Sequence, residues 1–407
     1  MNYKDIIARI DKSRKMITEK GRSLTYGEFL DLVAAKESEL CNYNSSDKKV
    51  LYLVQENTVI DELVTWIACQ SVNLVPAILP PDVKKENIAV ENIVVPQEAC
   101  MAVMTSGTTG TPKILFRTFE SWSDFFPVQD EILHINEDTV LFTSGTLSFT
   151  GNLNLYMDLF ALGTSVIAVR EFHPKTWVQE IIKHGANYIY LIPAKMRSLV
   201  KAVKEPISCV QYLVTGSQSF GKADCEITKK AFPNIKICLY YGASETNYMT
   251  YVWDYEMGDD VRLIGKAFPK MDLRLIDGVF YTNNTYGVMG IPNPYCTNDE
   301  GFQDEEGNFY FLGRVDDRLN VNGRKCSGYK IAEAMKQVFG LDSYACVEKE
   351  ENRESIVVYY EGAVLSDSVT ELRKLLKVKL EEFELPKKFI HVEALPRTAN
   401  GKIKKVR

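Results

Sequence analysis

A short loop rich in hydroxyl and glycine residues is the part of the sequence best suited to binding phosphate. It runs Thr105-Ser-Gly-Thr-Thr-Gly-Thr-Pro-Lys113, directly after the apolar run 102–104. Glycines let backbone N–H groups approach phosphate oxygens, the hydroxyls add hydrogen-bond donors, and the lysine adds a positive charge. The residues expected to contact phosphate are Thr105, Ser106, Gly107, Thr108, Thr109, Gly110 and Lys113.

The loop differs from the commonest phosphate-binding motif. A Walker A loop ends in Gly-Lys-Ser/Thr at the start of a helix, whereas here Pro112 precedes the lysine. An ordinary surface turn, in contrast, has no need of so many hydroxyl groups. The loop therefore indicates a nucleotide site of another type than those of P-loop kinases and GTPases.

The elements that must position this loop alternate between strands and helices. Short apolar strands are expected at 49–54, 102–104, 164–169, 188–192 and 210–214, and helices at 59–72, 176–184 and 195–203. Such alternation is typical of an α/β domain whose mostly parallel strands are buried on both faces and flanked by helices.

The pattern changes after about residue 260. Strands at 272–276, 278–281 and 309–312 follow one another with Asp, Asn and Gly turns between them, which predicts an antiparallel, β-barrel-like section. A mixed α+β pattern then returns, with helices at 331–339 and 366–383 and strands at 344–347 and 355–360. We expect a large domain over 1–315 and a small, mobile α+β domain over 316–407.

Composition and charge exclude several classes of protein. The nine cysteines form no CxxC pair and the four histidines have no metal-ligand spacing, so a metal would need oxygen ligands, as Mg²⁺ has with nucleotides. The N-terminus carries charges where a signal peptide needs apolar residues, and the most apolar segment, 64–79, is too polar to span a bilayer. The net charge of −6 disfavours nucleic acid as a partner. We therefore expect a cytoplasmic protein without a membrane span.

Several further motifs occur before and after the phosphate loop, in a fixed order. They are Leu24-Thr-Tyr-Gly-Glu-Phe29 and Leu74-Val-Pro-Ala-Ile-Leu-Pro80 before it, and Tyr240-Tyr-Gly-Ala-Ser-Glu245, Thr297-Asn-Asp299, the segment from Gly313 to Gly323 and Leu395-Pro-Arg-Thr-Ala-Asn-Gly-Lys402 after it. Together they resemble the ANL superfamily of adenylate-forming enzymes, which includes acyl- and aryl-CoA synthetases, adenylation domains of non-ribosomal peptide synthetases, and luciferases. The likeness spans residues 24 to 402, essentially the whole chain.

The resemblance implies that the chain uses ATP and Mg²⁺ to activate a small carboxylic acid as its adenylate. It assigns Glu245 to Mg²⁺ and Ser244 to the α-phosphate. The other implied nucleotide contacts are Tyr241 stacked on adenine, Gly216, Ser217 and Gly242 around the purine, and Asp299 and Arg314 on the ribose hydroxyls. Since ATP and a carboxylate are both anions, such a site must neutralise charge before the acid can attack the α-phosphorus.

The resemblance gives the C-terminal part a role in both half-reactions: formation of the adenylate, and transfer of the acyl group to a thiol. Lys402 would bridge ATP and the carboxylate, and Asp316 would be the hinge about which the small domain rotates afterwards. Gly323 and Lys325 would then lie near a phosphopantetheine thiol, of CoA or of an acyl carrier protein, which takes the acyl group as a thioester. From Asp317 onward 18 basic residues stand against 14 acidic ones, which suits an anionic thiol carrier but does not separate the two.

The sequence departs from the family pattern in places that concern the substrates. Ser148 stands where a histidine is common and Phe149 follows it, which fits a compact acid better than a long alkyl chain; strand-end packing explains the pair equally well. Gly242 would also line this acyl pocket. Asn298 replaces a usual glycine, a change that the backbone tolerates if it needs no positive φ there or only the left-handed helical conformation. Lys330 replaces a usual glutamate in the loop that shapes the thiol tunnel, so this loop bears on the acceptor.

Two alternatives remain open. The enzyme could load only a carrier protein in a siderophore or natural-product pathway, as small stand-alone aryl-acid ligases do; the short connection from Pro80 to Thr105 points in that direction. A different class is a non-catalytic nucleotide-binding scaffold on the same fold. The presence of Lys402, Glu245, Asp299 and Arg314 together argues against such a scaffold, because a protein without activity has no need of all four.

Overall fold

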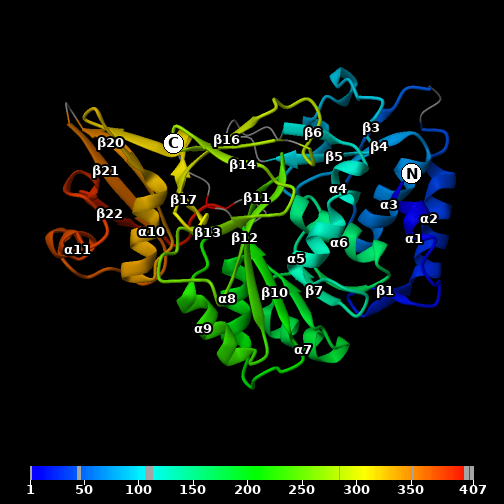
Figure 1. Cartoon of the computed structure of the whole chain (residues 1–407), viewed down its shortest axis with the longest axis horizontal. Coiled ribbons are helices and arrows are strands. Elements are labelled where there is room, and N and C mark those ends of the chain that lie inside the picture. The colour runs from blue at the N-terminus through cyan, green and yellow to red at the C-terminus, as the bar shows by residue number, and fades with distance from the viewer. Residues whose placement is uncertain are drawn as a thin grey trace. The chain divides into compact units, whose positions relative to one another are not determined.

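A computed structural model describes residues 2–43, 47–105, 113–283, 285–350, 353–397 and 403 of the chain. The structure divides into two compact units (Figure 1). Unit 1 holds Met1–Asp272 and Asn283–Tyr295, and unit 2 holds Leu273–Thr282 and Cys296–Arg407. The predicted division at residue 315 concerns which part moves during catalysis, and it stays a prediction.

The centre of unit 1 is a doubly wound parallel sheet. Its five parallel strands lie in the order β8–β7–β9–β10–β11, with bounds Ser165–Val169, Val140–Ser144, Tyr188–Tyr190, Tyr212–Gly216 and Lys236–Ala243. The chain therefore leaves β7 for β8 on one side and then returns to β9 on the other. In open sheets of this kind ligands bind outside the carboxyl ends of the strands, where the order reverses. Here that point lies between the ends of β7 and β9.

Helices cover this sheet, and residues at the ends of two of them explain where they begin or end. Helices α6 to α9 span Thr150–Ala161, Pro174–His184, Pro193–Ala202 and Lys222–Ala231, and Figure 1 shows α8 and α9 beside β10. Proline occupies the first turn of α7 and α8, where a missing N–H costs nothing, and Gly185 ends α7 in the left-handed conformation. Trp177 and Ile181 bury the inner face of α7 against the sheet.

The sheet of unit 1 extends on both sides and is joined by a second sheet. Beyond β11 lie β12 (Asn247–Trp253) and β13 (Leu263–Ala267), and beyond β8 lie β1 (Lys15–Glu19) and β2 (Arg22–Thr25). The second sheet has the order β3–β4–β5–β6, with bounds Val50–Val54, Leu74–Ile78, Met101–Thr105 and Lys113–Arg117. The other helices of unit 1 are α1 (Tyr3–Ile7), α2 (Tyr26–Leu40), α3 (Val59–Ser71), α4 (Glu120–Ser123), α5 (Phe126–Leu133) and the 3₁₀ turns Lys85–Asn87 and Val90–Asn92.

Unit 2 combines mostly antiparallel strands with two helices; β22 pairs with β21 in parallel. Its strands are β14 (Leu273–Ile276), β15 (Val279–Thr282), β16 (Tyr295–Gln303), β17 (Phe309–Arg314), β18 (Arg318–Val321), β19 (Arg324–Ser327), β20 (Ser343–Glu350), β21 (Arg353–Tyr360) and β22 (Lys388–His391). Its helices are α10 (Gly328–Phe339), α11 (Val369–Leu376) and the 3₁₀ turns Val315–Asp317 and Glu382–Glu384. Ile331, Met335 and Leu376 bury one face of the two helices against Val358 of β21.

The predicted fold class is confirmed: the chain is a mixed α/β protein with a large sheet and separate smaller sheets. The described strands form open sheets, and none of the described part closes into a barrel. The predicted helix over 366–383 is wrong in length. Ser368 caps α11 by accepting a hydrogen bond from the Glu371 N–H, so the helix begins at Val369, and it ends at Leu376. No helix within the described ranges is long and apolar enough to cross a membrane.

Candidate active site

The phosphate loop joins two adjacent antiparallel strands. Thr105, the last residue of β5, pairs directly with Lys113, the first residue of β6, and residues 106–112 between them lie outside the described part. The ends of the loop are therefore fixed by a ladder of hydrogen bonds. A strand rather than a helix follows the lysine, which agrees with the prediction that this is not a Walker A loop.

The second motif, Tyr240 to Glu245, ends β11 and enters a hairpin with β12. Gly242 pairs with Tyr248, and Ser244 and Glu245 occupy the turn. A Cβ atom at Gly242 would lie 2.4 Å from the Asn247 carbonyl oxygen, so the turn requires glycine at this position. Glu245 is half-buried, and its carbonyl accepts a hydrogen bond from Val288 N–H at 2.8 Å.

A buried arginine that the sequence did not single out ties these two motifs together. Arg117, the last residue of β6, is 0% exposed. It donates from Nη2 to the Ser244 carbonyl at 2.7 Å and from Nη1 to the Tyr286 carbonyl at 2.8 Å. Burial lowers the pKa of Arg117 to about 10, while the nearby Glu245 carboxylate raises it. One strand thus begins at the end of the phosphate loop and finishes on the Ser244–Glu245 turn.

We expect Arg117→Met to lower catalysis by misplacing this turn. The loss leaves two buried carbonyls without donors, which costs about 1–3 kcal/mol each. A shift of the turn by roughly 1 Å would lower the rate about 100-fold and weaken the dependence on Mg²⁺. Arg117→Lys, which keeps the charge but not the two-pronged geometry, should fall in between. ATP–pyrophosphate exchange measured over a range of Mg²⁺ concentrations checks this; wild-type kinetics in Arg117→Met would contradict it.

The predicted acyl-pocket residues lie at the reversal point of the parallel sheet. The segment Ser144–Phe149 follows β7, and Ser148, 7% exposed, shares a hydrogen bond with Thr146 at 2.7 Å between the two hydroxyl oxygens. The next residue, Thr150, contacts the Ser244 hydroxyl at 3.0 Å. The acyl segment and the Ser244–Glu245 turn therefore meet.

Phe149 belongs to a row of aromatic side chains at the ends of β9 and β11. Its ring stacks on Tyr190 with centroids 6.5 Å apart, and Tyr190 stacks on Tyr240 at 6.1 Å. The hydroxyl oxygens of the two tyrosines are 2.5 Å apart. A Cβ at Gly151 would lie 2.1 Å from the Tyr190 hydroxyl, so the protein itself fills the space beside Phe149.

The predicted purine residues lie at the ends of β10 and β11. Gly216 ends β10, and a Cβ there would lie 2.6 Å from the Tyr240 ring. Ser217 adopts a left-handed conformation with φ of 68°, which is uncommon outside glycine and typical of functional turns. Tyr241 alternates with the buried Tyr240 along β11 and is half-buried. Its predicted contact with adenine stays a prediction.

Unit 2 brings Asp299, Arg314 and Asp316 together. Asp299 pairs with Arg314 across β16 and β17, and Arg314 Nη1 donates to Asp299 Oδ1 at 3.2 Å. Arg314 also donates from Nε to Asp316 Oδ1 at 2.8 Å. Asn298 takes the left-handed conformation, with φ of 59°, which asparagine tolerates better than most residues other than glycine. An acid and a base side by side suit the ribose hydroxyls, which both donate and accept hydrogen bonds.

Gly323 forms the tip of the hairpin between β18 and β19. Val321 pairs with Arg324, and Asn322 and Gly323 both have positive φ, as a two-residue Asn-Gly turn requires. Lys325 is exposed on β19. Lys330 forms an ion pair with Glu384 at 2.5 Å, which gives a structural reason for a lysine at this position.

The catalytic lysine candidate, Lys402, lies outside the described residues. Arg397, at the start of the same motif, pairs with Ile403 in an antiparallel bridge, so both ends of the segment that carries Lys402 are fixed. Arg397 also forms ion pairs with Asp342, at 2.9 Å, and with Glu361.

The donors suit magnesium bound with a nucleotide better than a resident metal. No group of three or more His, Cys, Asp or Glu side chains within the described part could hold a metal ion. Mg²⁺ is usually held through one or two carboxylates together with substrate phosphates, and Glu245 supplies one carboxylate beside the phosphate-loop strand.

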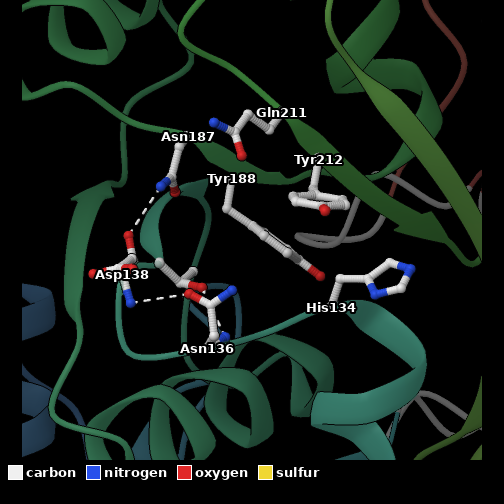
Figure 2. Close-up of a pocket in the computed structure, with 8 residues that line it drawn as sticks. His134, Asn136, Asp138, Asn187, Tyr188, Gln211 and Tyr212 are labelled. Carbon is white, nitrogen blue, oxygen red and sulfur yellow. Dashed lines mark hydrogen bonds between the residues drawn. The ribbon is translucent and has the colours of Figure 1, made fainter.

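A separate hollow of about 200 Å³ lies at the opposite end of the parallel sheet. Asp138, Asn187 and Gln211 line it just before β7, β9 and β10 begin (Figure 2). Asn187 Nδ2 donates to the Asp138 carbonyl at 2.9 Å, so the polar groups there satisfy one another. It therefore lies away from the predicted site, at the amino ends of the strands.

Comparison with known proteins agrees with this geometry. The model of the AMP-binding enzyme family matches residues 80–281. The "Putative long chain fatty acid-CoA ligase VraA" of Staphylococcus haemolyticus is 26% identical over 320 residues, which span 74% of this chain and 67% of VraA. The family match covers about half of the chain and confirms the predicted resemblance to the ANL superfamily of adenylate-forming enzymes.

Solved structures share the whole fold. O-succinylbenzoate coenzyme A synthetase (MenE) of Bacillus subtilis, in complex with ATP and magnesium, superimposes with a TM-score of 0.84 at 16% identity, covering 99% of this chain and 98% of MenE. The anthranilate CoA ligase AuaEII, in complex with anthranoyl-AMP, gives a TM-score of 0.86 at 14% identity, covering 99% of this chain and 96% of AuaEII. At this identity the likeness concerns the fold.

Proposed function

We propose that this protein activates a compact carboxylic acid with ATP and then transfers the acyl group to the phosphopantetheine thiol of CoA. The observation that carries the proposal is the buried network around Ser244. Arg117 links Ser244 to the strand of the phosphate loop, and Thr150 links it to the acyl segment. Three motifs distant in sequence thereby meet at one turn, which is what a reaction between ATP and an acid requires.

In the first half-reaction a carboxylate oxygen attacks the α-phosphorus of ATP. The new O–P bond forms as the bond to pyrophosphate breaks, which gives acyl-AMP and pyrophosphate. Lys113 and the loop N–H groups would hold the β- and γ-phosphates, and the Ser244 hydroxyl would donate to the α-phosphate. Mg²⁺ bound by Glu245 would neutralise phosphate charge.

In the second half-reaction a thiolate sulfur attacks the acyl carbon, and the C–O bond to AMP breaks. We propose that Asp299 and Arg314 bind the ribose hydroxyls and that Lys402 bridges ATP and the acid. Rotation about Asp316 would then withdraw Lys402 and bring Gly323 and Lys325 to the thiol. These roles, and the division between 1–315 and 316–407, remain part of the proposal.

The aromatic row supports a compact acid. The rings stack in the order Phe149, Tyr190, Tyr240 near the carboxyl ends of the parallel strands. Tyr190 also fills the space that Gly151 leaves. A long alkyl chain would need this volume. MenE and AuaEII are named for compact aromatic acids, whereas VraA is named for long-chain fatty acids. We propose an acid of the former size.

We expect Tyr190→Ala to lengthen the acids that the enzyme accepts. Removal of a buried ring leaves a cavity beside Phe149, and filling a hydrophobic pocket by one methylene changes kcat/KM by about 10- to 200-fold. Tyr190→Phe, which keeps the ring and loses only the hydroxyl bond to Tyr240, is the matched control. Exchange assays over straight-chain acids of increasing length measure the effect; an unchanged length profile would show that the row does not line the acyl pocket.

The thiol acceptor in the second half-reaction is either CoA or a carrier protein, and the two can be distinguished by experiment. CoA is proposed because the curated relatives VraA and YhfT are named as CoA ligases. Thioester formation should be compared with CoA and with a phosphopantetheinylated carrier protein at equal concentration. A product with the carrier alone would replace CoA in the proposal with the carrier-loading alternative, and the first half-reaction would be unaffected.

A further inference from the structure

A second cation lies at the point where the strand order reverses. Lys195 is in the first turn of α8, which follows β9, and its Nζ donates to the carbonyl of Ser144 at the end of β7 at 2.8 Å. The lysine therefore bridges the two strand ends between which the fold places its ligand crevice. None of the family motifs contains it.

Both predicted substrate loops are fastened to this turn of α8. The Ala194 N–H donates to Gln218 Oε1 at 3.0 Å, and Gln218 directly follows the purine residues 216–217. On the other side, a Cβ at Gly145 would lie 3.1 Å from Lys195 Nζ and 3.1 Å from Asn152 Nδ2. Gly145 has φ of 137°, so the acyl segment bends at the lysine. Lys195 thus lies where the acid and nucleotide segments converge.

The ammonium group has no counter-charge among the described residues. No ion pair forms with Lys195 there, and the only protein acceptor seen for its Nζ is the Ser144 carbonyl, although an ammonium carries three donors. Burial alone lowers the pKa of Lys195 to about 8. Ser144 is 5% exposed, and its buried hydroxyl also finds no hydrogen-bond partner in the part of the chain that the structure describes. Buried cations and hydroxyls are normally paired. The Lys195 ammonium and the Ser144 hydroxyl could therefore both bind an anionic group of a ligand.

The distance of Lys195 from the Ser244–Glu245 turn suits a contact with the end of the substrate that does not react. Ser244 follows β11, which lies two strands from β9 in the sheet, a separation of roughly 10 Å. Lys195 is therefore placed too far along the sheet edge to serve the carboxylate that attacks ATP. Tyr190, at the end of β9, stacks on Tyr240 of β11, and with Phe149 it would contact the middle of a short substrate.

We propose that Lys195 binds a second carboxylate of the substrate, so that the enzyme activates a compact dicarboxylic acid. This inference rests on the proposed function and names the substrate class of that site. Lys195 and Ser144 would hold one carboxylate, the aromatic row would contact the carbon skeleton, and the other carboxylate would reach the Ser244–Glu245 turn. A desolvated charge pair of this kind selects strongly against acids that leave the lysine unpaired.

Matched acid pairs test the proposal directly. Wild-type enzyme is assayed by ATP–pyrophosphate exchange with succinate against butyrate, glutarate against pentanoate, and phthalate against benzoate. We expect wild type to prefer the dicarboxylate member of at least one pair by about 30-fold or more in kcat/KM. Lys195→Met should abolish this preference and leave exchange with the monocarboxylates within about threefold of wild type. Lys201→Met, which removes an exposed lysine from the same helix, should behave as wild type.

Two results would overturn the inference: a wild-type enzyme that does not prefer the dicarboxylate in any pair, or an equal loss of both substrate types in Lys195→Met. Calorimetric titration of the same acids provides a readout independent of turnover. If no acid supports exchange but a dicarboxylate binds wild type and not Lys195→Met, the proposed function fails and the carboxylate site stands. If exchange occurs without any such preference, the proposed function stands and the site fails.

Discussion

We expect Lys402→Ala to abolish acyl-adenylate formation while the enzyme still converts supplied acyl-adenylate to the thioester. The lysine would hold two anions together as the acid attacks ATP, and loss of one such stabilising group costs about 100- to 1000-fold in rate. The thiol transfer needs no such bridge, since pyrophosphate has already left. ATP–pyrophosphate exchange reports the first step, and thioester formation from acyl-adenylate and CoA reports the second.

Lys404→Ala is the matched control, because it removes a lysine two residues further along the same tail. It should leave both half-reactions unchanged. An equal loss of both half-reactions in Lys402→Ala would contradict the rotation of the C-terminal part, because a residue withdrawn after the first step cannot serve the second.

The second large effect is expected at Glu245. Glu245→Gln keeps the shape of the side chain and removes the charge that would bind Mg²⁺, so exchange should fall about 100- to 1000-fold. The hairpin should remain intact, because Glu245 is held by its backbone carbonyl, which accepts from Val288, and the neighbouring Ser244 carbonyl is held by Arg117. The measurement is exchange as a function of Mg²⁺ concentration at fixed ATP.

Glu226→Gln on the exposed face of α9 is the control for loss of one negative charge. We expect its Mg²⁺ dependence to match wild type. A Glu245→Gln variant with wild-type Mg²⁺ dependence would mean that the metal is held elsewhere, and the assignment of this turn would then be wrong.

The strands of the parallel sheet could be predicted because they are apolar on both faces. The expected runs 164–169 and 188–192 correspond to β8 and β9 within two residues at either end. The order of the strands could not be read in this way, since it depends on pairing between distant segments. The strand order places the crevice between β7 and β9. Lys195 matters because it lies at that crevice.

The roles of the two cations Arg117 and Lys195 could not be predicted from the sequence, for a common physical reason. A single arginine or lysine outside a motif is usually a solvated surface charge, and nothing local distinguishes Arg117 or Lys195 from that class. Arg117 offered one signal, because it ends an apolar run and Phe119 follows shortly after it. The phosphate loop was recognisable from its own residues, whereas the metal and ribose candidates were identified only because several motifs occurred in the order typical of the family.

Acid-dependent ATP–pyrophosphate exchange tests the central claim most directly. The purified protein is incubated with ATP, Mg²⁺, labelled pyrophosphate and, one at a time, compact dicarboxylic, compact aryl, short-chain and long-chain acids. The proposed chemistry predicts exchange that requires both the acid and Mg²⁺, is greatest with a compact acid, and disappears in Lys402→Ala. Absence of exchange with every acid of the panel would contradict it and would favour a nucleotide-binding protein without catalytic activity.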